Sequence, residues 1–163
     1  MTPQPGDFGL VSVSGRAGWW INIGQALVGD GSRYQHAFIV VADGVCVEAQ
    51  PSGACTRVLS YYDGRSPAFS RLPLTDEQRV DIVSAAMTLI GTPYSFMDYA
   101  ALALDHWHVR PAWLKRYIAS SKRLICSQLV DECYRRAGVQ LFNDGRNPAD
   151  VTPGDLLYVL VEV

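Results

Sequence analysis

Cys126 and His36 could form a catalytic pair. In thiol catalysis a histidine imidazole accepts the proton of a nucleophilic cysteine and later donates it. Cys126 follows Lys122 and Arg123 and begins a segment whose apolar residues recur at helical spacing. Unpaired backbone N–H groups at a helix N-terminus lower the pKa of a thiol placed there, so Cys126 is a candidate thiolate. Because it also lies on the apolar stripe of that helix, a buried core cysteine is the alternative.

Glu48 is the candidate for the group that orients the histidine. It ends a strand expected over residues 45–49, and His36 stands at the leading edge of the apolar strand expected over residues 37–41. The Asp43-Gly44 dipeptide between them is typical of a two-residue hairpin turn. Pairing across that turn brings the carboxylate near the histidine strand, where it could hold one ring nitrogen while the other faces the thiol. A packing histidine and an exposed strand-end carboxylate are the alternatives.

The remaining pattern predicts strands first, helices in the middle and a closing strand, which is an α+β fold. Strands are expected over residues 9–13, 37–41, 45–49, 55–59, 68–72 and 156–163. Helices are expected over residues 19–28, 75–91, 96–107, 111–120 and 124–137. Thr75-Asp76-Glu77-Gln78 is a capping box that fixes the start of the second helix. No repeat or long linker divides the chain, so residues 1–163 are expected to form a single domain.

The composition excludes several classes of protein. The 163 residues are 48% hydrophobic and 18% charged, which is typical of a globular domain with one core. The net charge is -2 without any basic run, so we expect no nucleic-acid partner. No apolar stretch reaches the ~20 residues needed to span a bilayer, and no secretory signal is recognisable. We therefore expect a soluble protein that is cytoplasmic, or delivered outside the cell by another system.

Cysteine and histidine usage indicates neither a disulfide scaffold nor a metal site. The four cysteines are too few for a disulfide framework in a chain of this length. Cys46 and Cys55 could face each other across a hairpin, so a bridge between them is left open. His106 and His108 are the only close histidine pair, and no CxxC motif accompanies them. We expect no metal and no cofactor.

Three short motifs together resemble the NlpC-type papain-like cysteine peptidases. Gly91-Thr92-Pro93-Tyr94 is similar to their GxPY motif, and Cys126-Ser127-x-Leu129-Val130 to their CSxLV motif. Pro153-Gly154-Asp155-Leu156-Leu157 is similar to their PGDL strand. In ordinary members the histidine follows the cysteine, whereas His36 precedes Cys126 by ninety residues. That order resembles the circularly permuted branch, to which the lecithin:retinol acyltransferase-like proteins belong, and Pro5-Gly6-Asp7-Phe8-Gly9-Leu10 is similar to its first strand.

The resemblance implies a permuted papain-like fold, an antiparallel sheet packed against a helical subdomain. It implies Cys126 as nucleophile, His36 as base, Glu48 as orienting residue and Tyr94 near the oxyanion site. Ser95-Phe96 replaces the glycine pair usual after that tyrosine, so the resemblance fixes the substrate pocket less well than the triad.

The implied activity is hydrolysis through a thioester acyl-enzyme, of amide bonds such as those of peptidoglycan peptides. Acyl transfer or thioester hydrolysis on lipid acyl groups is the second hypothesis, and a catalytically inert binding or structural domain is the third. The expected partner is a small peptide, cell-wall fragment or acyl substrate, and residues 99–113 could form an apolar wall beside it. The oligomeric state is left open.

Overall fold

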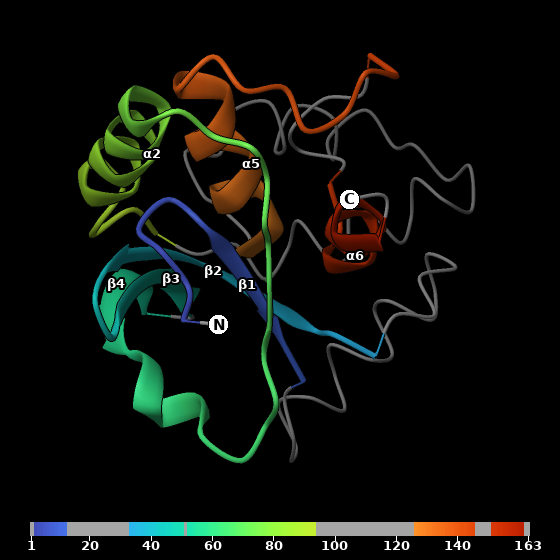
Figure 1. Ribbon diagram of the computed structural model, residues 1–163. Coiled ribbons are helices and arrows are strands. Elements are labelled where there is room, and N and C mark those ends of the chain that lie inside the picture. Colours follow the sequence, from blue (N-terminus) through green and yellow to red (C-terminus); the bar gives the residue numbers. More distant parts are fainter. Residues whose placement is uncertain (1, 13–32, 51, 94–125, 146–150, 162–163) are drawn as a thin grey trace, which may run out of the picture.

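A five-stranded antiparallel sheet forms the centre of the protein (Figure 1). The computed structural model describes residues 2–12, 33–50, 52–93, 126–145 and 151–161. The strands are β1 (Phe8–Val11), β2 (His36–Ala42), β3 (Val45–Gln50), β4 (Gly53–Val58) and β5 (Ala68–Phe69). Their order across the sheet is β4-β3-β2-β1-β5. The predicted α+β class is confirmed within the described residues, and β2, the strand that begins with His36, lies in the middle of the sheet.

The β2–β3 hairpin turns at Asp43 and Gly44, as predicted, with Gly44 at φ 69°. Only glycine adopts this left-handed conformation without a steric cost. The register shifts between Val40 and Ala42, so Phe38 lies opposite Glu48 rather than Ile39, which an unbroken two-residue hairpin would place there. Since paired residues share a face and faces alternate along a strand, His36 and Glu48 project to the same side of the sheet.

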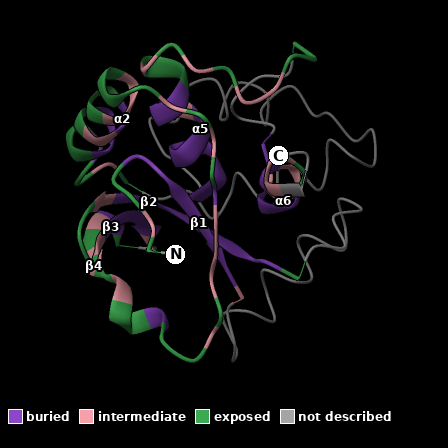
Figure 2. Ribbon diagram, in the orientation of Figure 1, coloured by how far each residue is buried: buried purple, intermediate pink, exposed green. Residues whose placement is uncertain are grey.

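The two faces of the sheet are covered by different elements. The helices α2 (Asp76–Thr88) and α5 (Cys126–Arg136) pack against one face, where they contact β2 and each other. The short 3-10 helix η1 (Leu59–Tyr62) covers the other face, and its Tyr62 joins a smaller buried cluster with Val11, Phe38 and Val40. Figure 2 shows that buried residues follow the strands and the inner side of α5, while the outer side of α2 is exposed.

The predicted capping box at the start of α2 is confirmed. Thr75 Oγ1 accepts a hydrogen bond from the backbone N–H of Gln78 at 3.2 Å, and the Gln78 side chain accepts from the Thr75 N–H at 2.9 Å. These two bonds satisfy backbone groups that the helix itself leaves unpaired. The helix ends with Leu89 as its cap, and Gly91 follows at φ 83°.

The strand predicted over residues 156–163 is wrong, because residues 153 to 161 form a helix, α6 (Pro153–Val161). Asp155 N donates to Thr152 Oγ1 at 3.2 Å, and Thr152 N donates to Asp155 Oδ2 at 2.8 Å. This reciprocal cap and the proline at the first helical position, where its missing N–H costs nothing, favour a helix start. The prediction of a strand relied on the β-branched and aromatic residues after Leu156. In the structure these residues lie on a helix, which buries Leu156 and leaves Tyr158 exposed.

Two further predicted strands have different bounds in the structure, and the bridge between Cys46 and Cys55 that was left open is absent. The strand predicted over residues 68–72 shortens to Ala68–Phe69, and the one over 55–59 begins earlier and ends at Val58. Cys46 and Cys55 carry no disulfide, because the register places Cys55 opposite Glu48 and Cys46 opposite Arg57. The helices predicted over residues 19–28, 96–107 and 111–120 lie outside the described residues, as do His106, His108 and the apolar wall over 99–113. None of the helices in the described ranges is long and apolar enough to cross a bilayer.

Candidate functional site

His36 and Glu48 form a buried hydrogen-bonded pair. His36 Nε2 donates to Glu48 Oε2 at 2.7 Å, and the Glu48 side chain is 0% exposed. A carboxylate only accepts hydrogen bonds, so this contact places the ring proton on Nε2. Because the β2–β3 register puts Phe38 opposite Glu48, His36 is the diagonal neighbour of that glutamate on the same face. The hairpin therefore positions both side chains on rigid backbone.

Cys126 lies against the same histidine. It is the first described residue of α5, it is buried, and its side chain is hydrogen-bonded to His36. With Nε2 given to Glu48, Nδ1 is the ring nitrogen that remains for the sulfur. The three side chains thus form one series, from the thiol through the imidazole to the carboxylate. The residues predicted to act together are brought together.

The pKa of His36 is raised from its ordinary 6.5 to about 9. Burial alone would lower this pKa, but the hydrogen bonds to Cys126 and then to Glu48, and the negative charges of both groups, outweigh it. Glu48 changes in the opposite sense: burial opposes its ionisation, but the hydrogen bonds lower its pKa from 4.5 to about 2. At neutral pH the site therefore holds an imidazolium beside a carboxylate, a pair suited to stabilise a thiolate.

Three further side chains hold the Glu48 carboxylate. Gln50 Nε2 donates to Glu48 Oε1 at 2.6 Å, and the Arg57 Nε–H donates to the same oxygen. The Tyr62 hydroxyl donates to Oε2, which His36 also uses. Each carboxylate oxygen therefore accepts two hydrogen bonds. A buried carboxylate with so many donors is fixed in one orientation and remains ionised.

These three residues were missed by sequence reasoning, for different reasons. Gln50 shares the face of Glu48 by strand alternation, so the period of the strand could have identified it. Arg57 needed the β3–β4 register, which places it opposite Cys46. Tyr62 gave no usable signal, because it lies on η1, outside the strand pattern.

The Tyr62 ring is itself positioned by stacking. It lies flat on Phe38, with ring centroids 5.0 Å apart and an interplanar angle of 4°. Phe38 also makes an edge contact with Phe69, at a centroid distance of 6.0 Å. Burial raises the pKa of the Tyr62 hydroxyl, and its hydrogen bond to the charged carboxylate raises it further, so Tyr62 stays a neutral donor.

The start of α5 is tied to the chain just before α6. Ser127 is 0% exposed, and its Oγ donates to the backbone carbonyl of Val151 at 2.5 Å. Val151 is also fully buried and immediately precedes Thr152, the residue that caps α6. The serine next to the candidate nucleophile therefore connects the start of α5 to the segment that leads into α6.

Tyr94, the fourth predicted site residue, lies outside the described residues, so its place near the oxyanion stays a prediction. The other cysteines differ in setting from Cys126. Burial raises the pKa of Cys133 to about 12, and burial followed by the nearby Glu48 charge raises that of Cys46 to about 12. No group of three or more His, Cys, Asp and Glu side chains in the described part of the chain is arranged to hold a metal ion.

No family model matches this sequence, and no curated protein matches it. Among solved structures, the crystal structure of the metalloprotein yiiX from Escherichia coli O157:H7, a DUF1105 protein, is similar to it. The TM-score is 0.59 and the identity 19%, over 92% of this chain and 79% of that one. At this identity the likeness shows a shared fold and nothing about activity.

Proposed function

We propose that this protein is a cysteine hydrolase of the permuted papain-like type, with Cys126 as nucleophile, His36 as base and Glu48 as the residue that orients the base. The observation that carries the proposal is the continuous hydrogen-bonded series of these three buried side chains. Cysteine, histidine and an orienting acceptor in this order are what nucleophilic acyl transfer requires. The fold shared with yiiX is consistent with the proposal but does not identify a reaction.

In the first half of the reaction, the Cys126 thiolate attacks the carbonyl carbon of the substrate. The carbonyl oxygen takes up the electron pair and becomes an oxyanion, which backbone N–H groups in the first turn of α5 stabilise, together with Tyr94. His36, held as an imidazolium by Glu48, then donates its proton to the departing amine or alkoxide. The carbon–heteroatom bond breaks, and a thioester joins the acyl group to Cys126.

In the second half, neutral His36 accepts a proton from a water molecule, whose oxygen attacks the thioester carbonyl. The carbon–sulfur bond breaks, the acid is released, and Cys126 leaves as a thiolate beside the newly protonated imidazole. Glu48 stabilises the imidazolium in both halves without itself gaining the proton, because its pKa is far below that of His36.

The preferred substrates are amides, such as the peptide bonds of peptidoglycan. The test is to mix the protein with peptidoglycan fragments or with acyl esters and to trap the acyl-enzyme by rapid acid quench. The masses of the intact protein and of its Cys126 peptide are then measured by mass spectrometry. A mass increase on the Cys126 peptide that is absent in Cys126→Ala supports the proposal, and the size of the increase names the acyl group. A lipid-acyl mass would select the transferase or thioesterase chemistry.

Single-residue variants distinguish the hydrolase hypothesis from the hypothesis of a catalytically inert domain with the same fold. We expect Cys126→Ala and His36→Ala to abolish turnover while retaining the wild-type circular dichroism spectrum. Retained turnover in Cys126→Ala, on any substrate that the wild type converts, overturns the proposal. A Cys126 thiol that reacts no faster than free cysteine favours a binding or structural domain.

A further inference from the structure

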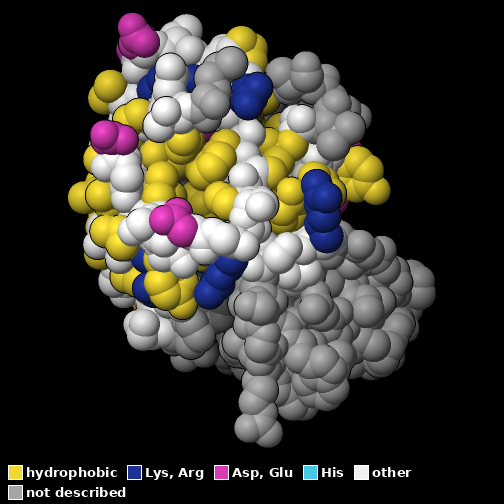
Figure 3. All heavy atoms as spheres, turned by 60° about the horizontal axis from the view of Figure 1, so that its bottom comes forward, with side chains coloured by type: hydrophobic (Ala, Val, Ile, Leu, Met, Phe, Trp, Pro, Cys, Tyr) yellow, Lys and Arg dark blue, Asp and Glu magenta, His cyan; other side chains and the backbone are white. Residues whose placement is uncertain are grey.

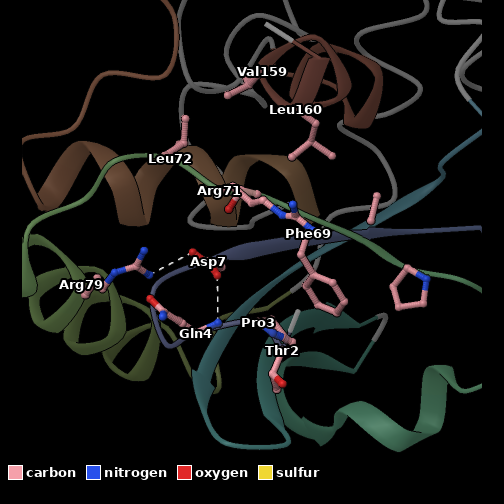
Figure 4. Close-up of a pocket in the computed structure, with 13 residues that line it drawn as sticks. Thr2, Pro3, Gln4, Asp7, Phe69, Arg71, Leu72, Arg79, Val159 and Leu160 are labelled. Carbon is pink, nitrogen blue, oxygen red and sulfur yellow. Dashed lines mark hydrogen bonds and ion pairs between the residues drawn. The ribbon is translucent and has the colours of Figure 1, made fainter. Parts of the chain in front are cut away.

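A groove runs along the outer edge of the sheet, beside the short strand β5 (Figure 4). Its volume is about 840 Å³, which lies within the roughly 300–1,000 Å³ usual for small-molecule sites. Its walls come from the segment before β1, from residues 67–72, from Arg79 on α2 and from the end of α6. Slightly more than half of the lining residues are apolar, among them Pro3, Pro67, Phe69, Leu72, Val159 and Leu160. On the face that Figure 3 turns forward, hydrophobic side chains lie next to Lys and Arg side chains.

Among the charged side chains that line the groove, Arg71 has no acidic partner in the described part of the chain. Arg79 Nη1 donates to Asp7 Oδ1 at 2.9 Å and to the Pro5 carbonyl at 2.9 Å, so this arginine and this aspartate neutralise each other. Asp7 Oδ2 also accepts from the backbone N–H of Gln4. Arg71 has no hydrogen bond, ion pair or ring contact in the part of the chain that the structure describes.

Arg71 differs in this respect from the other arginines of the described ranges, which all have an acidic or aromatic partner. These are Arg33, Arg57, Arg65, Arg79, Arg135 and Arg136. In Figure 4 the Arg71 side chain lies between Phe69 and Leu160, within the groove. A guanidinium beside apolar side chains offers two parallel donors that match a carboxylate, while the neighbouring apolar wall can pack against a hydrocarbon chain.

We propose that this groove binds a carboxylate carried by an apolar chain, with the carboxylate on Arg71 and the chain against the apolar wall. A peptide added as an extra strand fits the site less well, because β5 offers only two residues for ladder hydrogen bonds. The binding site needs no reactive thiol, so it goes beyond the proposed hydrolase activity and stands or falls separately from it.

The sheet register gives the position of Arg71 relative to His36. Ala68 pairs with Leu10, and Leu10 pairs with Ala37, the neighbour of that histidine. Since neighbouring strands lie about 4.8 Å apart, the Ala68 end of the groove is roughly 10 Å from the histidine strand. Arg71 follows three residues later, beside the Asp7 end of β1. Arg71 therefore lies at the end of the groove that is farther from His36.

The test is calorimetric titration of the full chain with decanoate, below its micelle concentration. We expect saturable binding that weakens about tenfold in Arg71→Gln, the loss typical of a hydrogen bond to a charged group. Leu160→Ala should weaken it as well, through lost apolar contact. Arg135→Gln is the matched control, because it removes the same charge from an exposed position on α5. Decanol, which has the chain without the charge, should bind at least tenfold more weakly than decanoate.

Absence of decanoate binding to the wild type overturns the inference. So does equal affinity in Arg71→Gln, or decanol binding as tight as decanoate, since either shows that the groove is merely apolar. Because Arg71 is exposed, its replacement is expected to leave the fold intact, which thermal unfolding of each variant verifies. Titration of Cys126→Ser should give the wild-type affinity; if that variant loses binding, the ligand site is not the groove.

Discussion

His36 and Glu48 lie on neighbouring strands but not opposite each other, and their side chains meet on the diagonal with a 2.7 Å contact from Nε2 to Oε2. The residue opposite Glu48 is Phe38, whose ring supports Tyr62, another donor to the same carboxylate. One glutamate thus receives the histidine and the tyrosine on a single oxygen. The orientation of the imidazole depends on a cluster of side chains rather than on one pair.

Glu48→Gln is expected to reduce turnover partially and to destabilise the fold. Each carboxylate oxygen accepts two hydrogen bonds, so an amide nitrogen at either position would face two donors. An unsatisfied buried donor costs about 1–3 kcal/mol, measurable by urea denaturation. The loss of kcat should be smaller than the ~10²–10⁴-fold that general acid–base catalysis contributes, because the base itself remains. Glu132→Gln, which changes a partly buried carboxylate of α5 that pairs with Arg135 and Arg136, is the control that should retain activity. Wild-type stability and kcat in Glu48→Gln would contradict the assigned role.

Cys126 should react with iodoacetamide at pH 6, where an ordinary thiol is largely protonated. The reason is the neighbouring His36 cation, so His36→Gln should slow the labelling at least tenfold. Cys46 and Cys133 have pKa values of about 12 and no neighbouring imidazolium in the described structure, so both should remain unlabelled. Cys55 is partly exposed, so the rates are best compared in a Cys55→Ser background by peptide mass mapping. Equal labelling rates with and without His36 would mean that the two side chains are not coupled.

Tyr62→Phe removes one hydroxyl and leaves the stacking on Phe38 in place. We expect a loss of about 1–2 kcal/mol in the free energy of unfolding, since the hydrogen bond to a buried carboxylate is lost. The pH–rate profile should change with it, because Glu48 loses a donor that lowers its pKa and orients it toward His36. Tyr61→Phe on the neighbouring, half-exposed position should change neither quantity. A purely structural role for Tyr62 would lower stability and leave the profile unmoved.

The free energy of unfolding should depend on pH through the titration of both His36 and Glu48. The pKa of His36 rises on folding from 6.5 to about 9, so its contribution is complete below pH 6.5 and is lost as the pH rises through about 9. The pKa of Glu48 falls from 4.5 to about 2, so its contribution is complete above pH 4.5 and is lost as the pH falls through about 2. Urea midpoints of the wild type minus those of His36→Gln should therefore shrink on the alkaline side. The same difference for Glu48→Gln should shrink on the acid side, and a difference that stays constant with pH would rule out the linkage.

Gly9→Ala is expected to destabilise the protein by about 1–3 kcal/mol or more through steric overlap. A methyl group at Gly9 would overlap two ring carbons of Phe38, and that ring is stacked on Tyr62. The strain would therefore reach the tyrosine that holds Glu48. Combining Gly9→Ala with Phe38→Leu should recover part of the stability, as measured by thermal unfolding. Full stability of the single variant would show that the ring can move aside without cost.

The local signals in the sequence were good guides to the hairpin and to α2. Asp43-Gly44 and the Thr75 capping box each act within a few residues, and both are present as predicted. The last element shows the opposite case. Its apolar, β-branched composition indicated a strand, but the hydrogen bonds between Thr152 and Asp155 start a helix. Capping chemistry overrode composition because it satisfies backbone groups directly.

The candidate site was predictable only in part, because some of its contacts join elements that are distant in the sequence. Residue type and spacing made Cys126, His36 and Glu48 candidates, the resemblance to the NlpC-type peptidases selected them, and the described structure joins them. The residues that hold the carboxylate could not be found in the same way, since Arg57 depends on the β3–β4 register and Tyr62 on the path of the chain after β4. Such contacts arise from packing between elements, on which the local pattern carries no information.

Two contacts make up the proposed catalytic centre, and they differ in the number of residues that separate the partners along the chain. His36 and Glu48 are twelve residues apart on one hairpin, whereas Cys126 follows His36 by ninety residues, from 36 to 126. Contacts between sequence neighbours form early and at small entropic cost, and distant ones form only when the elements dock. A partly folded chain would thus already hold its base while its thiol remained no more reactive than a free cysteine. The protein would acquire its chemical reactivity last, together with its finished shape.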